Sequence, residues 1–143
     1  MIHISDTARY DQPAGKIFAI LTDPSRYPAW QPDVDSATLT DDGPARQGAR
    51  VRQVRTVMGH RTEIGLTFTR LVPAELVTLA TAAGARPAVR QSYRLWQDGD
   101  GCRLDYKLTL DGVPKMAEHL ARAQLTRQIP QMLERLATIA ANR

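Results

Sequence analysis

This sequence has a single cysteine, few aromatic residues and no long apolar run. Cys102 is the one cysteine among 143 residues, which excludes an internal disulfide and fits a reducing, cytoplasmic environment. No apolar run approaches the roughly 20 residues that a membrane-spanning helix needs. The N-terminal stretch MIHISDTARYD alternates and contains an acid, unlike the basic-then-apolar pattern of a signal peptide. We therefore expect a cytoplasmic, globular protein without a membrane span.

The sequence also lacks the short motifs of common catalytic and cofactor sites. Its histidines, His3, His60 and His119, have no spacing typical of a metal site. It contains no glycine-rich phosphate or dinucleotide loop and no Ser-His-Asp signature. The net charge of +4 comes mostly from scattered arginines that form no nucleic-acid motif. We expect no metal, no cofactor and no nucleic-acid partner, while the charge weakly favours an acidic partner.

Residues Pro114 to Ala141 predict a long amphipathic helix on which the rest of the chain packs. Pro114 suits the first helical turn, and a helix of this length needs a surface for its apolar face. Pro130 predicts a kink, which either follows the curvature of a sheet or bends the helix away over a hollow. The apolar face consists of residues three or four apart: Leu125, Ile129, Met132, Leu136 and Ile139.

The region before this helix is predicted to be mainly β-structure. Pro13 begins a helix that ends near Pro24, and one helical turn follows in residues 24–32. Seven strands are predicted: residues 2–10, 34–40, 49–58, 61–72, 75–83, 88–97 and 102–111. We expect one α+β domain over residues 1–143. Its curved antiparallel sheet of about seven strands would surround the C-terminal helix, with two short helices after the first strand.

The turn between strands 49–58 and 61–72 decides which side chains face the core. Gly59-His60 suits a two-residue loop, which would pair Met58 with Arg61. A single bulge between the two strands would reverse the face. Without a bulge, one inward face carries six residues: Val51, Gln53, Arg55, Ile64, Leu66 and Phe68.

The clearest hairpin joins strands 88–97 and 102–111 through the turn at residues 98–101. Its outer face is expected to pair Trp96 with Arg103 as a cation–π contact, and Arg94 with Asp105 as an ion pair. Its inner face is expected to hold four cross-strand pairs: Leu95–Leu104, Tyr93–Tyr106, Gln91–Leu108 and Val89–Leu110.

Strand 75–83 gives two contradictory alternations. Counting from the turn before it predicts one inward set: Val77, Leu79 and Thr81. Counting from the turn after it predicts the other set: Leu76, Thr78, Ala80 and Ala82. The second set has mostly small side chains and would leave room between the sheet and the helix.

Four segments carry a resemblance to a known family. They are PAGKIFAILTDPSRYPAWQPDV at 13–34, GARVR at 48–52, Val72-Pro73, and DGDGCRL at 98–104. Together with the element order over nearly the whole chain, they resemble the START-like (SRPBCC) superfamily and, within it, the polyketide cyclase/dehydrase-like branch. The resemblance implies a helix-grip fold with a hydrophobic cavity beneath the long helix.

The function that the resemblance implies is binding of a hydrophobic small molecule, with aldol-type cyclisation and dehydration as a lyase-like reaction. Arg55 would hold a carboxylate or stabilise an enolate, and Tyr93 and Tyr106 would donate to a carbonyl as the other catalytic residues. The structural alternatives are an outward or ion-paired Arg55 and a packed tyrosine pair. The candidate ligand-binding residues are Trp30, Gln53, Leu66, Phe68, Gln91, Leu108 and Leu120.

Two other functions fit the same residues. One is a non-catalytic carrier of a lipid or another small molecule. The other is a module that binds a macromolecule through an outer basic stripe: Arg90, Arg94, Arg103 and Lys107. The stripe would equally dock an acidic acyl carrier protein that delivers a polyketide-like substrate. Whether the protein forms a homodimer is left open.

Overall fold

The computed structural model describes residues 1–57 and 59–142 and contains the expected elements in the expected order. The strands are β1 (Ile2–Tyr10), β2 (Val34–Leu39), β3 (Arg50–Val57), β4 (His60–Val72), β5 (Leu76–Ala80), β6 (Ala88–Asp98) and β7 (Gly101–Asp111). The helices are α1 (Ala14–Leu21), the 3₁₀ turn η1 (Pro24–Arg26), α2 (Tyr27–Trp30) and α3 (Lys115–Ala141). The α+β prediction is confirmed.

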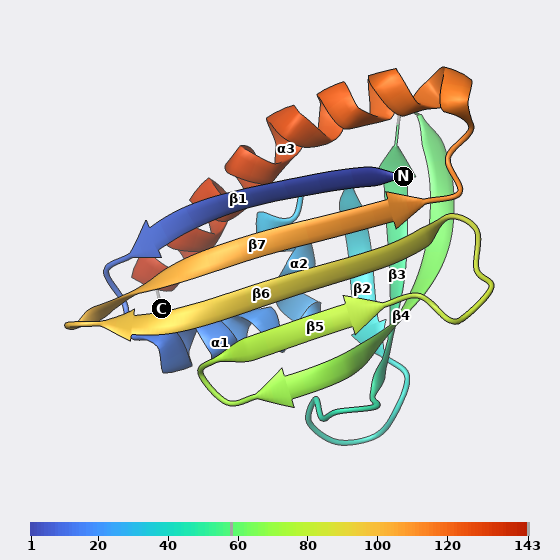
Figure 1. Cartoon of the computed structure of the whole chain (residues 1–143). Helices are drawn as coiled ribbons and strands as arrows, with labels where there is room; N and C mark the ends of the chain where they lie inside the picture. The colour runs from blue at the N-terminus through green and yellow to red at the C-terminus, as the bar shows by residue number, and fades with distance from the viewer. Residues whose placement is uncertain (58, 143) are drawn as a thin grey trace.

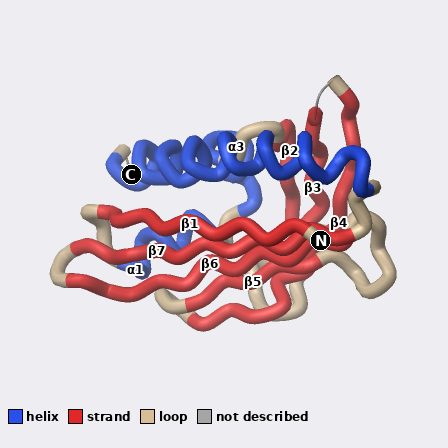
Figure 2. The backbone as a smooth tube through the Cα atoms, turned by 45° about the horizontal axis from the view of Figure 1, so that its top comes forward, coloured by secondary structure: helices blue, strands red, loops and turns tan. Residues whose placement is uncertain are grey.

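The strands form one antiparallel sheet in the order β1-β7-β6-β5-β4-β3-β2. The sheet is strongly curved, so that β2, β3 and β4 stand steeply against the other four strands (Figure 1). Helix α3 runs along β1 on the inner side of the curve, and α1 and α2 lie on the same side (Figures 1 and 2). No helix in the described part of the chain is long and apolar enough to cross a membrane.

The β6–β7 hairpin has the predicted register. Tyr93 pairs with Tyr106, and Gln91 with Leu108, on the inner face. On the outer face the Arg103 guanidinium lies 4.3 Å from the centre of the Trp96 ring, which confirms the cation–π contact. The ion pair was predicted with the wrong arginine. Asp105 lies 3.5 Å from Nε of Arg103, two residues along the same strand, because alternate residues of a strand share a face.

The β3–β4 hairpin has the predicted facing but not the predicted register. Thr56, and not Met58, pairs with Arg61, which shifts the register by two residues. Met58 itself lies outside the described residues. Because side chains alternate with a period of two, a shift of two leaves every side chain on its predicted face. Gln53 pairs with Ile64 without an intervening bulge, so Gln53 and Arg55 face inward.

Strand β5 follows the first of the two alternations. Val77 pairs with Tyr93, and Leu79 with Gln91, so both residues share the inner face with these partners. A register shift lies in the β4–β5 ladder between Phe68 and Arg70. The second alternation, with Thr78 among the inward residues, is therefore wrong. Small side chains on β5 are not what leaves room beneath α3.

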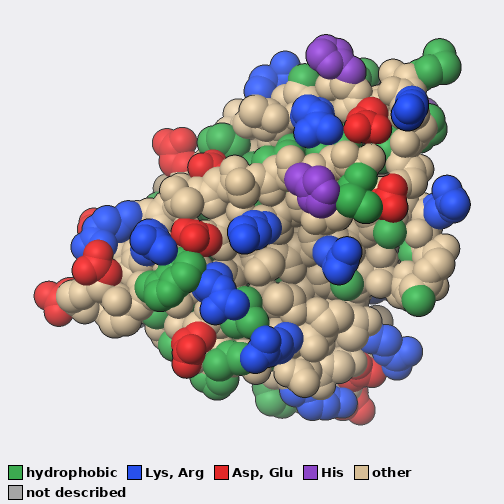
Figure 3. Space-filling model, viewed as in Figure 1, with side chains coloured by type: hydrophobic (Ala, Val, Ile, Leu, Met, Phe, Trp, Pro, Cys, Tyr) green, Lys and Arg blue, Asp and Glu red, His purple; other side chains and the backbone are tan. Residues whose placement is uncertain are grey.

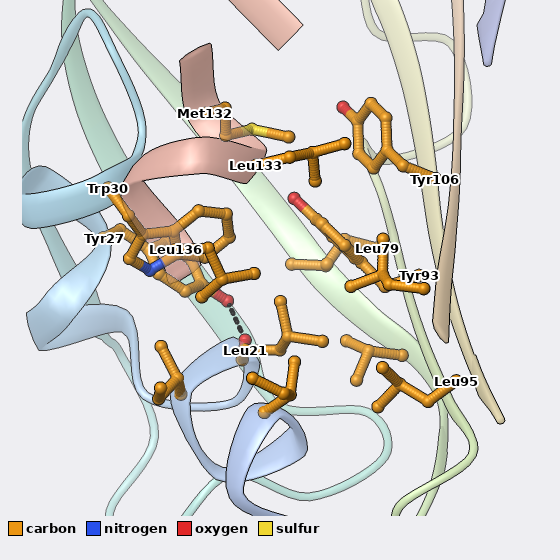
Figure 4. Close-up of a cluster of buried hydrophobic side chains, with 14 of the residues drawn as sticks. Leu21, Tyr27, Trp30, Leu79, Tyr93, Leu95, Tyr106, Met132, Leu133 and Leu136 are labelled. Carbon is orange, nitrogen blue, oxygen red and sulfur yellow. Dashed lines mark hydrogen bonds between the residues drawn. The ribbon is translucent and has the colours of Figure 1, made fainter. Parts of the chain in front are cut away.

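Helix α3 continues through Pro130 to Ala141 as one element. Its buried residues all lie in the second half: Ile129, Met132, Leu133, Leu136 and Ala140. There the helix packs against a core in which Trp30 makes edge-to-face contacts with Tyr27 and Tyr93, with ring centres 5.5 and 6.1 Å apart (Figure 4). No residue from Lys115 to Gln128 is buried. The second half of α3 therefore anchors the helix to the sheet.

Candidate functional site

A cavity of about 510 Å³ lies between the inner face of the sheet and the middle of α3. Strand residues from β3, β4, β6 and β7 form its floor, and Ala121, Leu125, Ile129 and Met132 of α3 form its roof. Its volume is within the range of known small-molecule sites.

Exposed residues among those that line the cavity mark its mouth. Thr62 and Glu63 of β4 lie at one side, and Arg86 and Pro87 of the β5–β6 loop lie at another. The mouth is thus formed by strand β4 and the β5–β6 loop.

Arg55 places a positive charge inside the cavity. It lines the cavity and is half-buried, and its guanidinium donates to two glutamine oxygens. Nε donates to Oε1 of Gln53 at 3.1 Å, and Nη2 donates to Oε1 of Gln31 at 3.3 Å. Both glutamines are buried, at 1% and 4% exposed, and both line the cavity. Arg55 is therefore oriented by two neutral acceptors.

Tyr106 and Tyr93 stand side by side across the β6–β7 ladder. Their ring centres are 4.9 Å apart, and their hydroxyl groups point toward Met132 and Leu133 of α3 (Figure 4). Burial raises the pKa of both phenols, and the Arg55 charge opposes this shift. Both side chains are therefore neutral hydrogen-bond donors at pH 7. Tyr106 lines the cavity, whereas Tyr93 lies behind it.

Two carboxylates also line the cavity, and both already have partners. Asp33, which follows α2, accepts a hydrogen bond from Nε2 of Gln128. Glu63 binds Arg52 on the outer face at 2.7 and 2.8 Å, and that hydrogen bond holds the pKa of the Glu63 carboxyl below its ordinary value. Neither carboxylate forms an ion pair with Arg55 among the described residues.

The structure brings most of the candidate residues to the cavity. Six of them line it: Gln53, Arg55, Leu66, Gln91, Tyr106 and Leu108. Tyr93 is in contact with this group through Tyr106, and its hydroxyl lies 3.5 Å from Oε1 of Gln91. Sequence patterns located these residues because the strand alternation alone determines which of them face inward.

Three candidates lie elsewhere. Trp30 is fully buried in the packed core and does not reach the mouth, and its indole N–H has no partner among the described residues. Phe68 is fully buried next to the same core, and Leu120 is 53% exposed on α3. None of the three lines the cavity.

Sequence reasoning missed Gln31, Asp33 and Gln128. They reach the cavity through contacts between segments that are distant in sequence: Gln31 meets Arg55 across 24 residues, and Asp33 meets Gln128 across 95. Their residue types carried no signal, because polar residues next to prolines or on a helix are usually solvent-exposed. Among the described residues, no group of three or more His, Cys, Asp or Glu is placed to hold a metal ion.

The sequence and the fold were both found to be similar to those of known proteins. A family model described as "Polyketide cyclase / dehydrase and lipid transport" matches residues 1–141. A START superfamily protein from Mycobacterium smegmatis has a TM-score of 0.78 at 14% identity, over 98% of this chain and 97% of that one. The Zhui aromatase/cyclase from Streptomyces sp. R1128 has a TM-score of 0.77 at 17% identity, over 99% and 94%. At such identities the structural likeness shows the fold alone. No curated protein matches the sequence.

Proposed function

The chain belongs to the polyketide cyclase/dehydrase and lipid transport family within the START-like superfamily. From this family membership we propose that the protein binds a hydrophobic, carbonyl-bearing small molecule in the cavity. We further propose that it promotes aldol-type cyclisation of this molecule and loss of water. The observation that carries the proposal is a cavity of about 510 Å³ that has apolar residues in its roof and floor and a polar cluster around Arg55 and Tyr106. An apolar wall binds the ligand, and a few polar groups orient it.

The polar cluster suits the charges that develop in such a reaction. When an enolate attacks a carbonyl, negative charge forms on oxygen and a proton must be supplied there. The Tyr106 hydroxyl supplies a hydrogen bond or the proton, and the Arg55 guanidinium stabilises an oxygen that bears negative charge. Tyr93 positions Tyr106 through ring contact and is not itself at the cavity wall. Binding a flexible chain in a folded shape supplies the rest of the rate enhancement.

A non-catalytic carrier is the second candidate, and one observation favours it. Burial raises the pKa of Tyr93 and Tyr106, so neither phenol is a base near neutral pH. No histidine is among the described residues that line the cavity, which leaves Asp33 as the carboxylate outside an ion pair for proton removal. If Asp33 keeps its bond to Gln128 with ligand bound, the cavity holds a ligand without changing it.

A cavity-blocking variant tests the proposal. Leu125 lies in the roof, so Leu125→Trp should fill part of the cavity and weaken binding of the neutral probe Nile red by about fivefold to tenfold. Leu120→Trp places the same side chain on the exposed side of α3 and should bind the probe as the parent does. Equal probe binding by the parent and Leu125→Trp proteins, with the melting temperature unchanged, would refute the cavity as the ligand site.

Native mass spectrometry of the purified protein with its bound small molecule distinguishes an enzyme from a non-catalytic carrier. A ligand whose mass changes by the loss of water over time supports catalysis, and Tyr106→Phe should then slow the change about 10- to 100-fold. A ligand that stays bound and unchanged supports the carrier.

The proposal also covers the domain organisation, the cellular location and the partners of the protein. We treat residues 1–143 as one domain that acts in the cytoplasm. The outer face of the sheet carries scattered Lys and Arg side chains with acidic ones between them (Figure 3), and the four stripe residues Arg90, Arg94, Arg103 and Lys107 are exposed there. Docking of an acidic acyl carrier protein on this face, and formation of a homodimer, remain predictions.

A further inference from the structure

The Arg55 guanidinium lies inside the cavity with no acid next to it. Among the described residues no carboxylate lies within ion-pair distance, and the oxygens that it binds belong to the neutral side chains of Gln31 and Gln53. An arginine keeps its charge at every physiological pH, so the charge is present whether or not a ligand is bound. Two amide oxygens orient the guanidinium but do not neutralise it.

The two glutamines add further donors to the same place. Because each turns its oxygen toward Arg55, each turns its –NH₂ group away from Arg55. Neither nitrogen has an acceptor in the described part of the chain, and neither is sealed from the cavity space as the Trp30 indole nitrogen is. The guanidinium and the two amides therefore form a cluster of donors with no acceptor of their own, which suits a bound anion.

The nearby acids do not fill this role. Glu63 binds Arg52 on the outer face, and Asp33 binds Gln128 at the roof. The other arginine that lines the cavity, Arg86, is exposed at the mouth, so Arg55 supplies the positive charge farther inside. Its charge matches one negative charge, and its planar pair of N–H groups matches the two oxygens of a carboxylate. The apolar residues of the roof and floor, among them Leu108 and Leu125, leave room for a hydrocarbon body beyond the charged group.

We infer that the ligand carries one carboxylate group, which binds between the Arg55 guanidinium and the side-chain amides of Gln31 and Gln53. The inference rests on the proposed function, because it names the chemical class of the molecule in that cavity. The oxygen that bears negative charge at Arg55 is then that of the carboxylate, and Tyr106 alone is left to donate to a carbonyl oxygen along the body of the ligand. Acids should bind more tightly than alcohols or amines of the same length.

The test is a competition assay in which dodecanoic acid, dodecanol and dodecylamine each displace Nile red from the full chain at pH 8. The acid should compete at least about tenfold better than the alcohol, since a hydrogen bond to a charged group is worth more than a neutral one. In Arg55→Met the advantage of the acid should fall to within about twofold, while the affinity for the alcohol is retained. Asp33→Asn should strengthen binding of the acid, because it removes a negative charge from the lining of the same cavity.

Arg90→Met is the matched control, because Arg90 is an exposed arginine of β6 that does not line the cavity. It should leave the ratio of acid to alcohol unchanged. If Arg55→Met does not fold, Arg55→Lys keeps the charge and should keep part of the advantage. Equal competition by acid and alcohol in the parent protein overturns the inference while leaving the cavity as a ligand site. Failure of Nile red itself to bind would count against the proposed function as well.

Discussion

The two halves of α3 cover the same sheet in different ways. From Ile129 onward the helix packs against a core of leucine, tryptophan and tyrosine side chains, and Leu136 is fully buried. From Lys115 to Gln128 it has no buried residue, and the cavity lies beneath the stretch from Ala121 to Met132. One element thus supplies both the stability of the fold and the roof of the candidate site. The packed end keeps the helix in place, so the other end need not fill the space beneath it.

The tyrosines show the same difference. Tyr27 donates to the carbonyl of Leu21 at 2.6 Å, and Tyr10 donates to the carbonyl of Leu133 at 3.0 Å, so both hydroxyls bind the backbone at the packed end. Tyr106 instead lines the cavity, and the partner named for its hydroxyl is another phenol, that of Tyr93, and not the backbone. A hydroxyl at the cavity wall that is not bound to the backbone can turn to bind a ligand.

The largest expected effect comes from removing a side chain at the packed end. Leu136→Ala should lower the free energy of unfolding by about 2–5 kcal/mol, because it leaves a void in a filled core. Leu120→Ala, in the other half of α3, should change it by no more than about 0.5 kcal/mol. Urea denaturation followed by circular dichroism measures both. Similar losses in the two variants would mean that the halves do not differ.

Alkaline pH tests whether the tyrosines of both ends are shielded from water. Burial raises the pKa of Tyr10, Tyr27, Tyr93 and Tyr106 above the ordinary value. Below about pH 10 the phenols are protonated in the folded and the unfolded chain alike, so stability from this source is constant. Above it the unfolded chain ionises first, and the free energy of unfolding should fall by up to about 1.4 kcal/mol per pH unit for each tyrosine.

Single variants show how much of this loss of stability above pH 10 comes from a tyrosine of the packed core and how much from one at the cavity. Tyr27→Phe and Tyr106→Phe should each reduce the loss of stability above pH 10 by the share of one tyrosine, measured as urea midpoints across the pH series. A slope unchanged by Tyr106→Phe would show that water reaches this hydroxyl as freely in the folded protein as in the unfolded chain.

The smallest expected effect comes from the same two variants at pH 7. Tyr27→Phe loses the bond to the Leu21 carbonyl and should lower the free energy of unfolding by about 1 kcal/mol. Tyr106→Phe loses no bond to the backbone, only its contact with the Tyr93 hydroxyl, so it should lower the free energy of unfolding by less than Tyr27→Phe does, while its ligand binding or turnover falls. Equal destabilisation by the two variants would place Tyr106 in the packed core.

Local chemistry located the elements and most of the site. The turn at 98–101 set the β6–β7 register, which placed Tyr93 beside Tyr106. Arg55 was predicted to face inward even though its hairpin register was wrong by two, because an even shift preserves the face. The β5 alternation was ambiguous, since a register shift between Phe68 and Arg70 leaves no mark in composition.

By itself, then, the sequence determined the order of helices and strands and the inward set of strand residues, because these depend on the periodicity of neighbouring side chains. Only the tertiary structure decided that α3 is anchored by its second half, that Trp30 belongs to the packed core, and that Gln31 meets Arg55. Such contacts join residues whose separation along the chain carries no pattern, and the cavity arises from the curvature of the whole sheet, which no single segment encodes.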